Sequence, residues 1–362
     1  MGLIKFNNEQ KLVQNEIRKF AVQEVEPLSQ DIENEGRIPE SVFKKLIELG
    51  LLSPIIPSEF GGAGMDTTSL CIIIEELSKS CASLAFILAA NSLAGFVLLK
   101  FSSEKFKSYL NRLANGEIAG FSFDNGTRGL KIVQENPLII NGKNRFVLNG
   151  EIAHFYLLSL KTEKDSGLFV VEKTDAKKIV KPYLLGVKSA GIADIDFENL
   201  QISEESFIIN SANITGAMEE INRYFALCLS AIALGIAQAA LEASIKYSKE
   251  RRQFNRPICD FPMVREMLAE MRIKIEAAKD IVYDTAIRVD SGEDYALASD
   301  IALATSAETA VYCGIKSVQV FGGYGYTKDY PVERYLRDAK SIQVIGQSGF
   351  VLREKIVRNL LG

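Results

Sequence analysis

The sequence predicts an α+β protein of several domains: a helical N-terminal domain, a middle antiparallel β-barrel-like domain and a C-terminal four-helix bundle. Three observations predict this order. Apolar residues recur at three- and four-residue intervals over 9–113, short runs rich in Val, Ile, Phe and Leu follow over 114–209, and long helical periodicity returns after 214. We therefore expect domains at 1–113, 114–209 and 210–362.

The N-terminal part has the spacing of amphipathic helices. One helix is marked by Leu12, Val13, Ile17, Phe20 and Ala21, and another by Val42, Leu46 and Ile47. The glycine-rich stretch 59–64 follows two prolines and predicts a loop. Helices joined by tight loops are therefore expected before residue 114.

The middle part alternates apolar runs with turn residues. Strands are expected at 138–140, 146–148, 155–160 and 168–171. Two Asn-Gly pairs, at Asn141 and at Asn149, predict turns, because both residues tolerate the left-handed backbone that tight turns need. This texture is typical of a β domain.

The C-terminal part predicts helices over 216–250, 262–291 and 295–318, with enough length for a four-helix bundle. Its longest apolar stretch, 225–241, is interrupted by Ser230 and Gln238 and flanked by charges. A buried core helix is therefore expected there, and no membrane span.

Composition excludes several classes of function. A formal charge of −4 gives no basic surface for nucleic acid, and the first twenty residues mix charged with apolar residues, unlike a signal sequence. His154 is the only histidine, and the five cysteines lack CxxC spacing, which argues against a metal site and against histidine-dependent hydrolysis. We expect a cytoplasmic protein whose chemistry comes from a cofactor.

Two stretches carry chemistry. The first, 251–258, reads Arg-Arg-Gln-Phe-Asn-Arg-Pro-Ile, and the second, 319–326, reads Gln-Val-Phe-Gly-Gly-Tyr-Gly-Tyr. The planar, permanently charged Arg251 suits phosphate oxygens, and Gly322 and Gly323 lack the Cβ atoms that would keep backbone amides from a ligand. Taken singly, a salt-bridged helix end and a plain turn explain them equally well.

Together, and followed by Tyr-Pro-Val-Glu-Arg-Tyr-Leu-Arg-Asp-Ala-Lys at 330–340, these stretches resemble the acyl-CoA dehydrogenase superfamily. The resemblance implies FAD as cofactor, an acyl-CoA or acyl-carrier-protein substrate, and a homo- or hetero-oligomer, dimer or tetramer. In that family the two stretches hold the diphosphate and adenosine end of FAD across a subunit interface. The cofactor-binding residues implied here are Arg251, Gln253, Phe254, Gln319, Gly322, Gly323 and Ser348.

The catalytic residue is where the sequence departs from the family. The family uses a glutamate as base, and its two usual positions fall on Gly346 and Phe225, so the catalytic residue stays unknown. Glu219 and Glu220 lie upstream of Phe225 and can in principle replace it, although solvated carboxylates at a helix start are the simpler interpretation.

The expected flavin-ring contacts differ as well. The stretch 123–129 stands in place of a Thr-Glu-Pro-x-Ala-Gly-Ser-Asp pattern, and an Ile-Thr-Asn-Gly turn is expected to be deleted between Ala153 and Phe155. Three functions stay open. They are an FAD-linked oxidoreductase acting on an acyl thioester with a relocated base, a catalytically silent subunit that completes the FAD pocket of a partner, and a flavin monooxygenase or N-hydroxylase.

Overall fold

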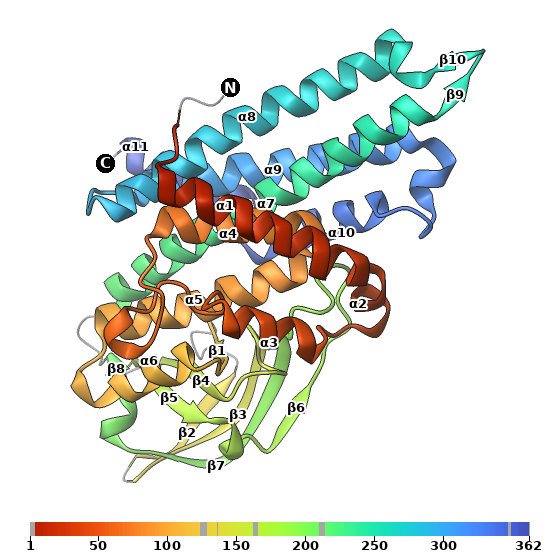
Figure 1. Cartoon of the computed structure of the whole chain (residues 1–362). Helices are drawn as coiled ribbons and strands as arrows, with labels where there is room; N and C mark the ends of the chain where they lie inside the picture. Colours follow the sequence, from red (N-terminus) through yellow and green to blue (C-terminus); the bar gives the residue numbers. More distant parts are fainter. Residues whose placement is uncertain are drawn as a thin grey trace.

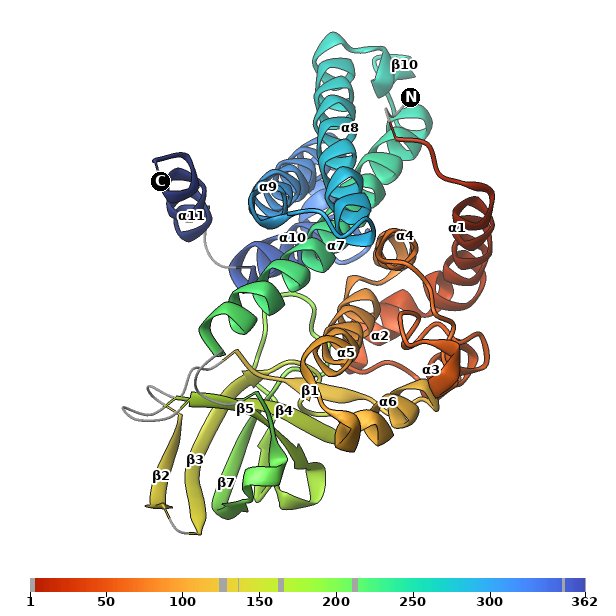
Figure 2. The ribbon, with the colours of Figure 1, turned by 90° about the vertical axis from the view of Figure 1, so that its left-hand side faces the viewer.

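The predicted fold class is confirmed: helices come first, two β-sheets follow, and a helical bundle ends the chain (Figure 1). The computed structural model describes residues 4–123, 129–135, 137–161, 166–209, 214–346 and 349–361. In the view of Figure 2 the sheets lie at the bottom, the N-terminal helices beside them, and the bundle above.

The N-terminal helices are α1 (Asn8–Phe20), α2 (Ser29–Glu35), α3 (Glu40–Glu48), α4 (Thr67–Ser80), α5 (Ala82–Phe101) and α6 (Lys107–Ala114). The two predicted amphipathic helices are confirmed, since α1 buries Ile17 and Phe20 and α3 buries Val42 and Leu46. Almost every residue of α4 and α5 is buried, so these two helices form the centre of the N-terminal part.

Within the described ranges the middle part has eight strands in two sheets: β1 (Ala119–Phe121), β2 (Leu130–Glu135), β3 (Leu138–Val147), β4 (Phe155–Lys161), β5 (Ser166–Glu172), β6 (Lys178–Val180), β7 (Ala193–Ile202) and β8 (Phe207–Ile209). The strand orders are β1-β4-β5-β8 and β2-β3-β7-β6. All pairs are antiparallel except β1 with β4. Side chains of both sheets, Tyr156 and Ile195 among them, share one apolar cluster.

One of the two predicted Asn-Gly turns is wrong. Asn141 and Gly142 lie inside β3, where the pairing with β7 shifts register and Gly142 has a φ of 133°. The pair thus forms a bulge, which the same left-handed tolerance permits. Asn149 and Gly150 do form a turn after β3, with φ 54° at Asn149.

The C-terminal part contains α7 (Ile214–Glu250), the short strands β9 (Arg252–Gln253) and β10 (Arg256–Pro257), α8 (Pro262–Asp290), α9 (Ala296–Phe321), α10 (Val332–Ile345) and α11 (Gly349–Leu361). Helices α7 to α10 form the predicted bundle. By length and composition α5 and α7 could cross a membrane, but 89% and 94% of their apolar windows are buried inside the protein. The prediction of a core helix over 225–241 is confirmed.

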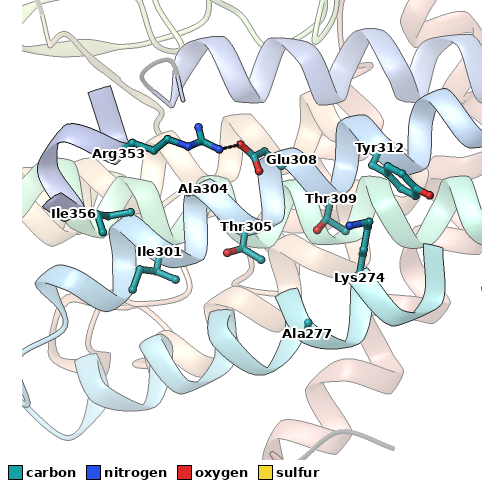
Figure 3. A pocket seen from close by; sticks show the side chains of 10 residues that line it. All are labelled: Lys274, Ala277, Ile301, Ala304, Thr305, Glu308, Thr309, Tyr312, Arg353 and Ile356. Carbon is teal, nitrogen blue, oxygen red and sulfur yellow. Dashed lines mark hydrogen bonds and ion pairs between the residues drawn. The ribbon is translucent and has the colours of Figure 1, made fainter. Parts of the chain in front are cut away.

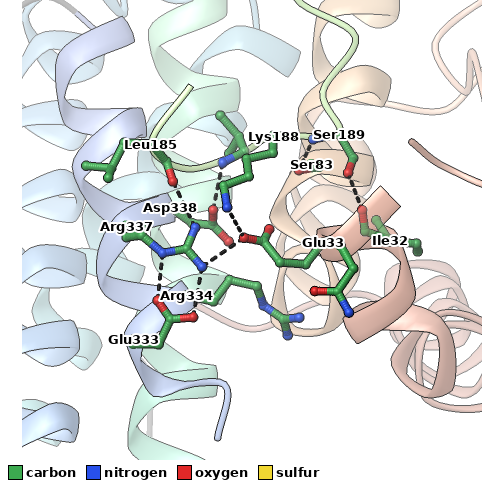
Figure 4. A network of polar contacts seen from close by, with 12 residues as sticks. Ile32, Glu33, Ser83, Leu185, Lys188, Ser189, Glu333, Arg334, Arg337 and Asp338 are labelled. Atoms are coloured by element: carbon green, nitrogen blue, oxygen red, sulfur yellow. Dashed lines mark hydrogen bonds and ion pairs between the residues drawn. The ribbon is translucent and has the colours of Figure 1, made fainter. Parts of the chain in front are cut away.

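A polar network joins α2, the segment before β7 and α10 (Figure 4). Arg337 donates to the carbonyl of Leu185 at 2.8 Å and forms an ion pair with Glu33 at 2.8 Å. Asp338 accepts the backbone N–H of Val187 at 2.7 Å. Because this network and one apolar core cross all three parts, the divisions at 113/114 and 209/210 stay predictions.

The network predicts a pH dependence of stability. Burial raises the pKa of Asp338 from 3.8 to about 6, so the folded protein holds this proton more tightly than the unfolded chain does. The stabilisation from Asp338 is therefore complete below pH 3.8 and lost as the pH rises through 6. Asp338→Asn, whose amide oxygen still accepts from Val187, is expected to flatten the change in unfolding free energy between about pH 4 and 6. Urea titrations at both pH values measure the unfolding free energy of the variant and of the unchanged protein. An equal change between the two pH values in both proteins contradicts the prediction.

Candidate functional site

The first predicted stretch begins where α7 ends. Arg251 donates its backbone N–H to Tyr247, and the chain then turns back as the β9-β10 hairpin. Phe254 and Asn255 at the tip both have positive φ, 49° and 65°, which is the backbone of a tight two-residue turn. Figure 1 shows this hairpin projecting beyond the ends of α7 and α8.

The second predicted stretch begins where α9 ends. Gly322 has φ 60° and ψ −135°, a conformation open to glycine alone, and its N–H donates to the carbonyl of Gln319. A Cβ added at Gly322 or at Gly323 would meet no atom within 4 Å. The backbone at these glycines therefore faces open space that a ligand can approach.

The two stretches meet in a cavity of about 470 Å³. Four predicted cofactor-binding residues line it: Arg251, Gln253, Gly322 and Gly323. The guanidinium of Arg251 is exposed and makes no ion pair within the part of the chain that the structure describes. The cavity thus combines an uncompensated positive charge with an open glycine backbone, a donor set suited to phosphate oxygens.

Two other predicted residues, Phe254 and Gln319, do not line this cavity. Phe254 is 88% exposed at the hairpin tip, with its ring 6.3 Å from that of Phe261. Gln319 is exposed on the last turn of α9. Ser348 lies outside the described residues.

Sequence reasoning missed the aromatic wall of the cavity. Tyr247 stacks on Phe321 with ring centroids 4.0 Å apart, and Tyr330 packs edge-on against Phe321 at 5.1 Å. Arg251 lies over the ring of Tyr324 at 5.8 Å. Tyr247 precedes Arg251 by one helical turn, so helical spacing could have placed it beside Arg251. Stacked aromatic rings next to an arginine are suited to a flat, electron-rich base.

The two positions at which the resemblance leads us to expect a catalytic glutamate, 225 and 346, hold no carboxylate. Both are closely surrounded by other side chains. Phe225 on α7 is 4% exposed, and its ring lies against Phe123 and Phe86. A Cβ at Gly346 would lie 2.9 Å from a methyl carbon of Leu303 on α9. Neither position therefore has room for a glutamate unless its neighbours move.

The two upstream glutamates occupy different environments. Glu220 forms an ion pair with Lys100 at the end of α5, and its side chain is 26% exposed. Glu219 is 62% exposed and lies 3.6 Å from Arg223. Glu219 is thus a solvated carboxylate, as the simpler interpretation expects. The carboxylate of Glu220 is paired with Lys100.

At the expected flavin-ring end, residues 124–128 of the predicted contact stretch lie outside the described residues. The predicted deletion between Ala153 and Phe155 stays a prediction. An Asn-Gly turn lies a few residues earlier, at Asn149 and Gly150, and Leu148 precedes it. Between the turn and β4, the side chain of His154 accepts the N–H of Ile118, the residue before β1, at 3.0 Å.

A second cavity, of about 540 Å³, lies between α8, α9 and α11 (Figure 3). It contains none of the predicted residues. An ion pair between Arg353 of α11 and Glu308 of α9 closes one side, and Lys274 on α8 lies over the ring of Tyr312. Within the described ranges, no group of three or more His, Cys, Asp or Glu side chains could hold a metal ion.

Known proteins match this chain over nearly its full length. The sequence pattern of the acyl-CoA dehydrogenase N-terminal domain matches residues 7–117, and that of the acyl-CoA dehydrogenase C-terminal domain matches 216–361. A 3-(aryl)acrylate reductase of Clostridium sporogenes is 32% identical, covering 98% of this chain and 99% of its own. A short-chain-specific acyl-CoA dehydrogenase of Clostridium acetobutylicum is 33% identical over 93% of each chain.

The solved structure of butyryl-CoA dehydrogenase from Megasphaera elsdenii superposes with a TM-score of 0.93 and 25% identity, covering 99% of this chain and all of that one. The match therefore includes the helical parts, both sheets and the two stretches of the cavity. From these full-length similarities, the chain belongs to the acyl-CoA dehydrogenase family.

Proposed function

We propose that this chain is an FAD-linked oxidoreductase acting on an acyl thioester, bound either to CoA or to a carrier protein. The observation that carries the proposal is the cavity in which Arg251 and Gln253 meet Gly322 and Gly323. FAD, the cofactor of the family, supplies hydride acceptance when bound. A cavity of about 470 Å³ accommodates one end of such a dinucleotide.

The chemistry of the lining assigns a task to each residue. Arg251 offers a planar fork to the diphosphate, and the backbone at Gly322 and Gly323 can approach the same oxygens without steric hindrance. The rings of Tyr247 and Tyr324 border the charged group and suit an adenine face. This end of the site can therefore hold a dinucleotide without any contribution from the two base positions.

The reaction needs a proton acceptor near the α-carbon of the thioester, and Phe225 and Gly346 offer none. In an active enzyme the base is therefore relocated. A monooxygenase or N-hydroxylase needs no such base, but no feature of the described residues favours that alternative.

A second function is favoured by the packing of these positions. In a catalytically silent subunit, the cavity completes the FAD site of a partner chain, and the chain's own base position can be filled by packing. The aromatic contacts of Phe225 and the close approach of Leu303 to Gly346 support this alternative.

The visible spectrum of the chain purified alone separates the two functions. If near-stoichiometric FAD bleaches when an acyl thioester is added, the chain is an enzyme with a relocated base. If the chain is colourless and turns yellow only when mixed with a glutamate-bearing relative, it is the silent half of the site. A chain that takes up no FAD in either setting contradicts both.

We infer that the chain is an oligomer, homomeric or heteromeric. Large apolar side chains are exposed on the hairpin and the C-terminal helices: Phe254, Met263, Ile273, Ile315, Phe350 and Leu361 are each more than half exposed. Exposed apolar side chains can take part in association surfaces. Sedimentation equilibrium is expected to give a dimer or tetramer, and a monomer at micromolar concentration contradicts the inference.

A further inference from the structure

The cavity between α8, α9 and α11 is built on one face of α9 (Figure 3). Its lining residues on α9 follow the i, i+3, i+4, i+7 spacing of a helix face from Ile301 to Tyr312. The volume of about 540 Å³ lies within the range of pockets that hold small molecules. No residue lines both this cavity and the one beside Arg251, so the two are separate sites.

One end of the cavity carries a cation without a carboxylate partner. Lys274 of α8 lies over the ring of Tyr312, with its Nζ 4.9 Å from the ring centroid, and makes no ion pair within the described ranges. Thr309 lies one helical turn before Tyr312 on the same face of α9 and is 5% exposed. Its hydroxyl makes no hydrogen bond with any residue that the structure describes. Because buried hydroxyls are normally paired, an ammonium and an unpaired hydroxyl together suit an anionic oxygen.

The other cation of the cavity is already neutralised. Arg353 of α11 forms an ion pair with Glu308 of α9, and it also donates to the carbonyl of Gly349 at 2.9 Å. The two paired side chains are 57% and 50% exposed, so they lie at the rim of the cavity. An anion that enters is therefore attracted to Lys274 and not to Arg353.

The opposite end of the cavity is apolar. Ile301 and Ala304 of α9 line it together with Ile356 of α11 (Figure 3). Thr309 and Ile301 are eight residues apart on α9, which separates the polar from the apolar end by about 12 Å along the helix axis. The cavity is thus amphipathic along its length.

We propose that this cavity binds a medium-chain carboxylate. The carboxylate oxygens accept from Lys274 and Thr309, and the hydrocarbon chain lies along Ala304 toward Ile301 and Ile356. Burial of the chain against these side chains removes apolar surface from water. The proposal is independent of the proposed thioester function, because the site shares no residue with the cavity beside Arg251 and needs no FAD.

Titration of octanoate into the full-length protein as purified, followed by isothermal titration calorimetry, tests the proposal. Saturable binding is expected in the millimolar range or tighter. Lys274→Met keeps the aliphatic stem and is expected to weaken octanoate about tenfold, and Thr309→Val, close in shape, about threefold to tenfold. Ala304→Leu fills the apolar end and is expected to weaken octanoate as well. The neutral 1-octanol is expected to bind Lys274→Met as well as it binds the unchanged protein.

Lys316→Met is the matched control. Lys316 lies over the same Tyr312 ring, at 5.4 Å, but does not line the cavity, so its loss is expected to change octanoate affinity by less than about twofold. The proposal is overturned if octanoate does not bind, or if folded Lys274→Met binds it as tightly as the unchanged protein. The second outcome is also what an octanoate site elsewhere, or a second copy of the chain covering this cavity, would give.

Equal losses in Lys274→Met and Lys316→Met would likewise overturn the proposal, because general surface charge would then explain the binding. Thermal unfolding shows which variants are folded, and Lys274→Met and Thr309→Val decide the question if Ala304→Leu does not fold. Flavin absorbance is read separately. Protein without FAD contradicts the proposed function, while the octanoate affinities still decide this site.

Discussion

Arg251→Gln is expected to weaken FAD binding by roughly tenfold to a hundredfold, the loss typical when a charged hydrogen-bond donor is removed from an ionised partner. The guanidinium lines the cavity and makes no ion pair within the described ranges, so its charge is available to the diphosphate. Glutamine keeps a neutral N–H donor and loses the charge, the fork and part of the length of arginine. Titration of FAD into apoprotein, followed by flavin fluorescence, measures the change.

Arg252→Gln is the matched control for this substitution. Arg252 is the next residue and is also exposed, but it donates to the carbonyl of Asn255 within the hairpin and does not line the cavity. Its FAD affinity is expected to stay within about twofold of the unchanged protein. Equal losses in the two variants would mean that the hairpin as a whole, and not the fork of Arg251, holds the cofactor.

Gly235→Ala is expected to destabilise the fold by roughly 2 to 4 kcal/mol, through overpacking at a helix crossing. A Cβ at Gly235 on α7 would overlap the backbone oxygen of Glu75 and the hydroxyl of Ser78 on α4. The two helices cannot simply separate, because the buried carboxylate of Glu75 accepts from Gln238 at 2.9 Å and from Tyr283 at 2.6 Å. Denaturant unfolding measures the loss.

The same helix offers a control with the same substitution. Gly216 lies near the start of α7, exposed, and a Cβ there would meet nothing within 4 Å. Gly216→Ala is expected to be neutral or stabilising by up to about 1 kcal/mol, because alanine loses less backbone freedom on folding. If both variants lose stability alike, the crossing with α4 is not the cause of the loss, because alanine favours a helix more than glycine does.

The turn prediction shows where local sequence information ends. Asn141-Gly142 and Asn149-Gly150 are the same dipeptide, yet the first forms a bulge inside β3 and the second a turn. Both settings need a left-handed or unusual backbone, and the dipeptide supplies it in each. The choice depends on β7, which pairs with β3 on both sides of Gly142 and comes about fifty residues later in the chain.

The cavity between the two stretches was predictable in part for a similar reason. Arg251, Gln253 and the glycine pair stand in motifs whose residue types suit phosphate, so each could be named from the chain. Tyr330 packs against Phe321 of the cavity because the chain before α10 passes beside the end of α9, and nothing in its local sequence marks that contact. Phe254 belongs to the same motif, yet the hairpin carries it away from the cavity.

The sequence by itself determined the order of helices and strands, the core helix within α7, the absence of a carboxylate at residues 225 and 346, and four residues of the cavity, because these follow from periodicity and residue type. Only the tertiary structure decided that Phe225 packs between Phe86 and Phe123, that Gly235 marks a helix crossing, and that Asp338 is buried at a junction of three parts. Each of these depends on contacts between residues far apart in the chain, and side-chain packing in three dimensions, unlike helical spacing, leaves no periodic pattern in the sequence.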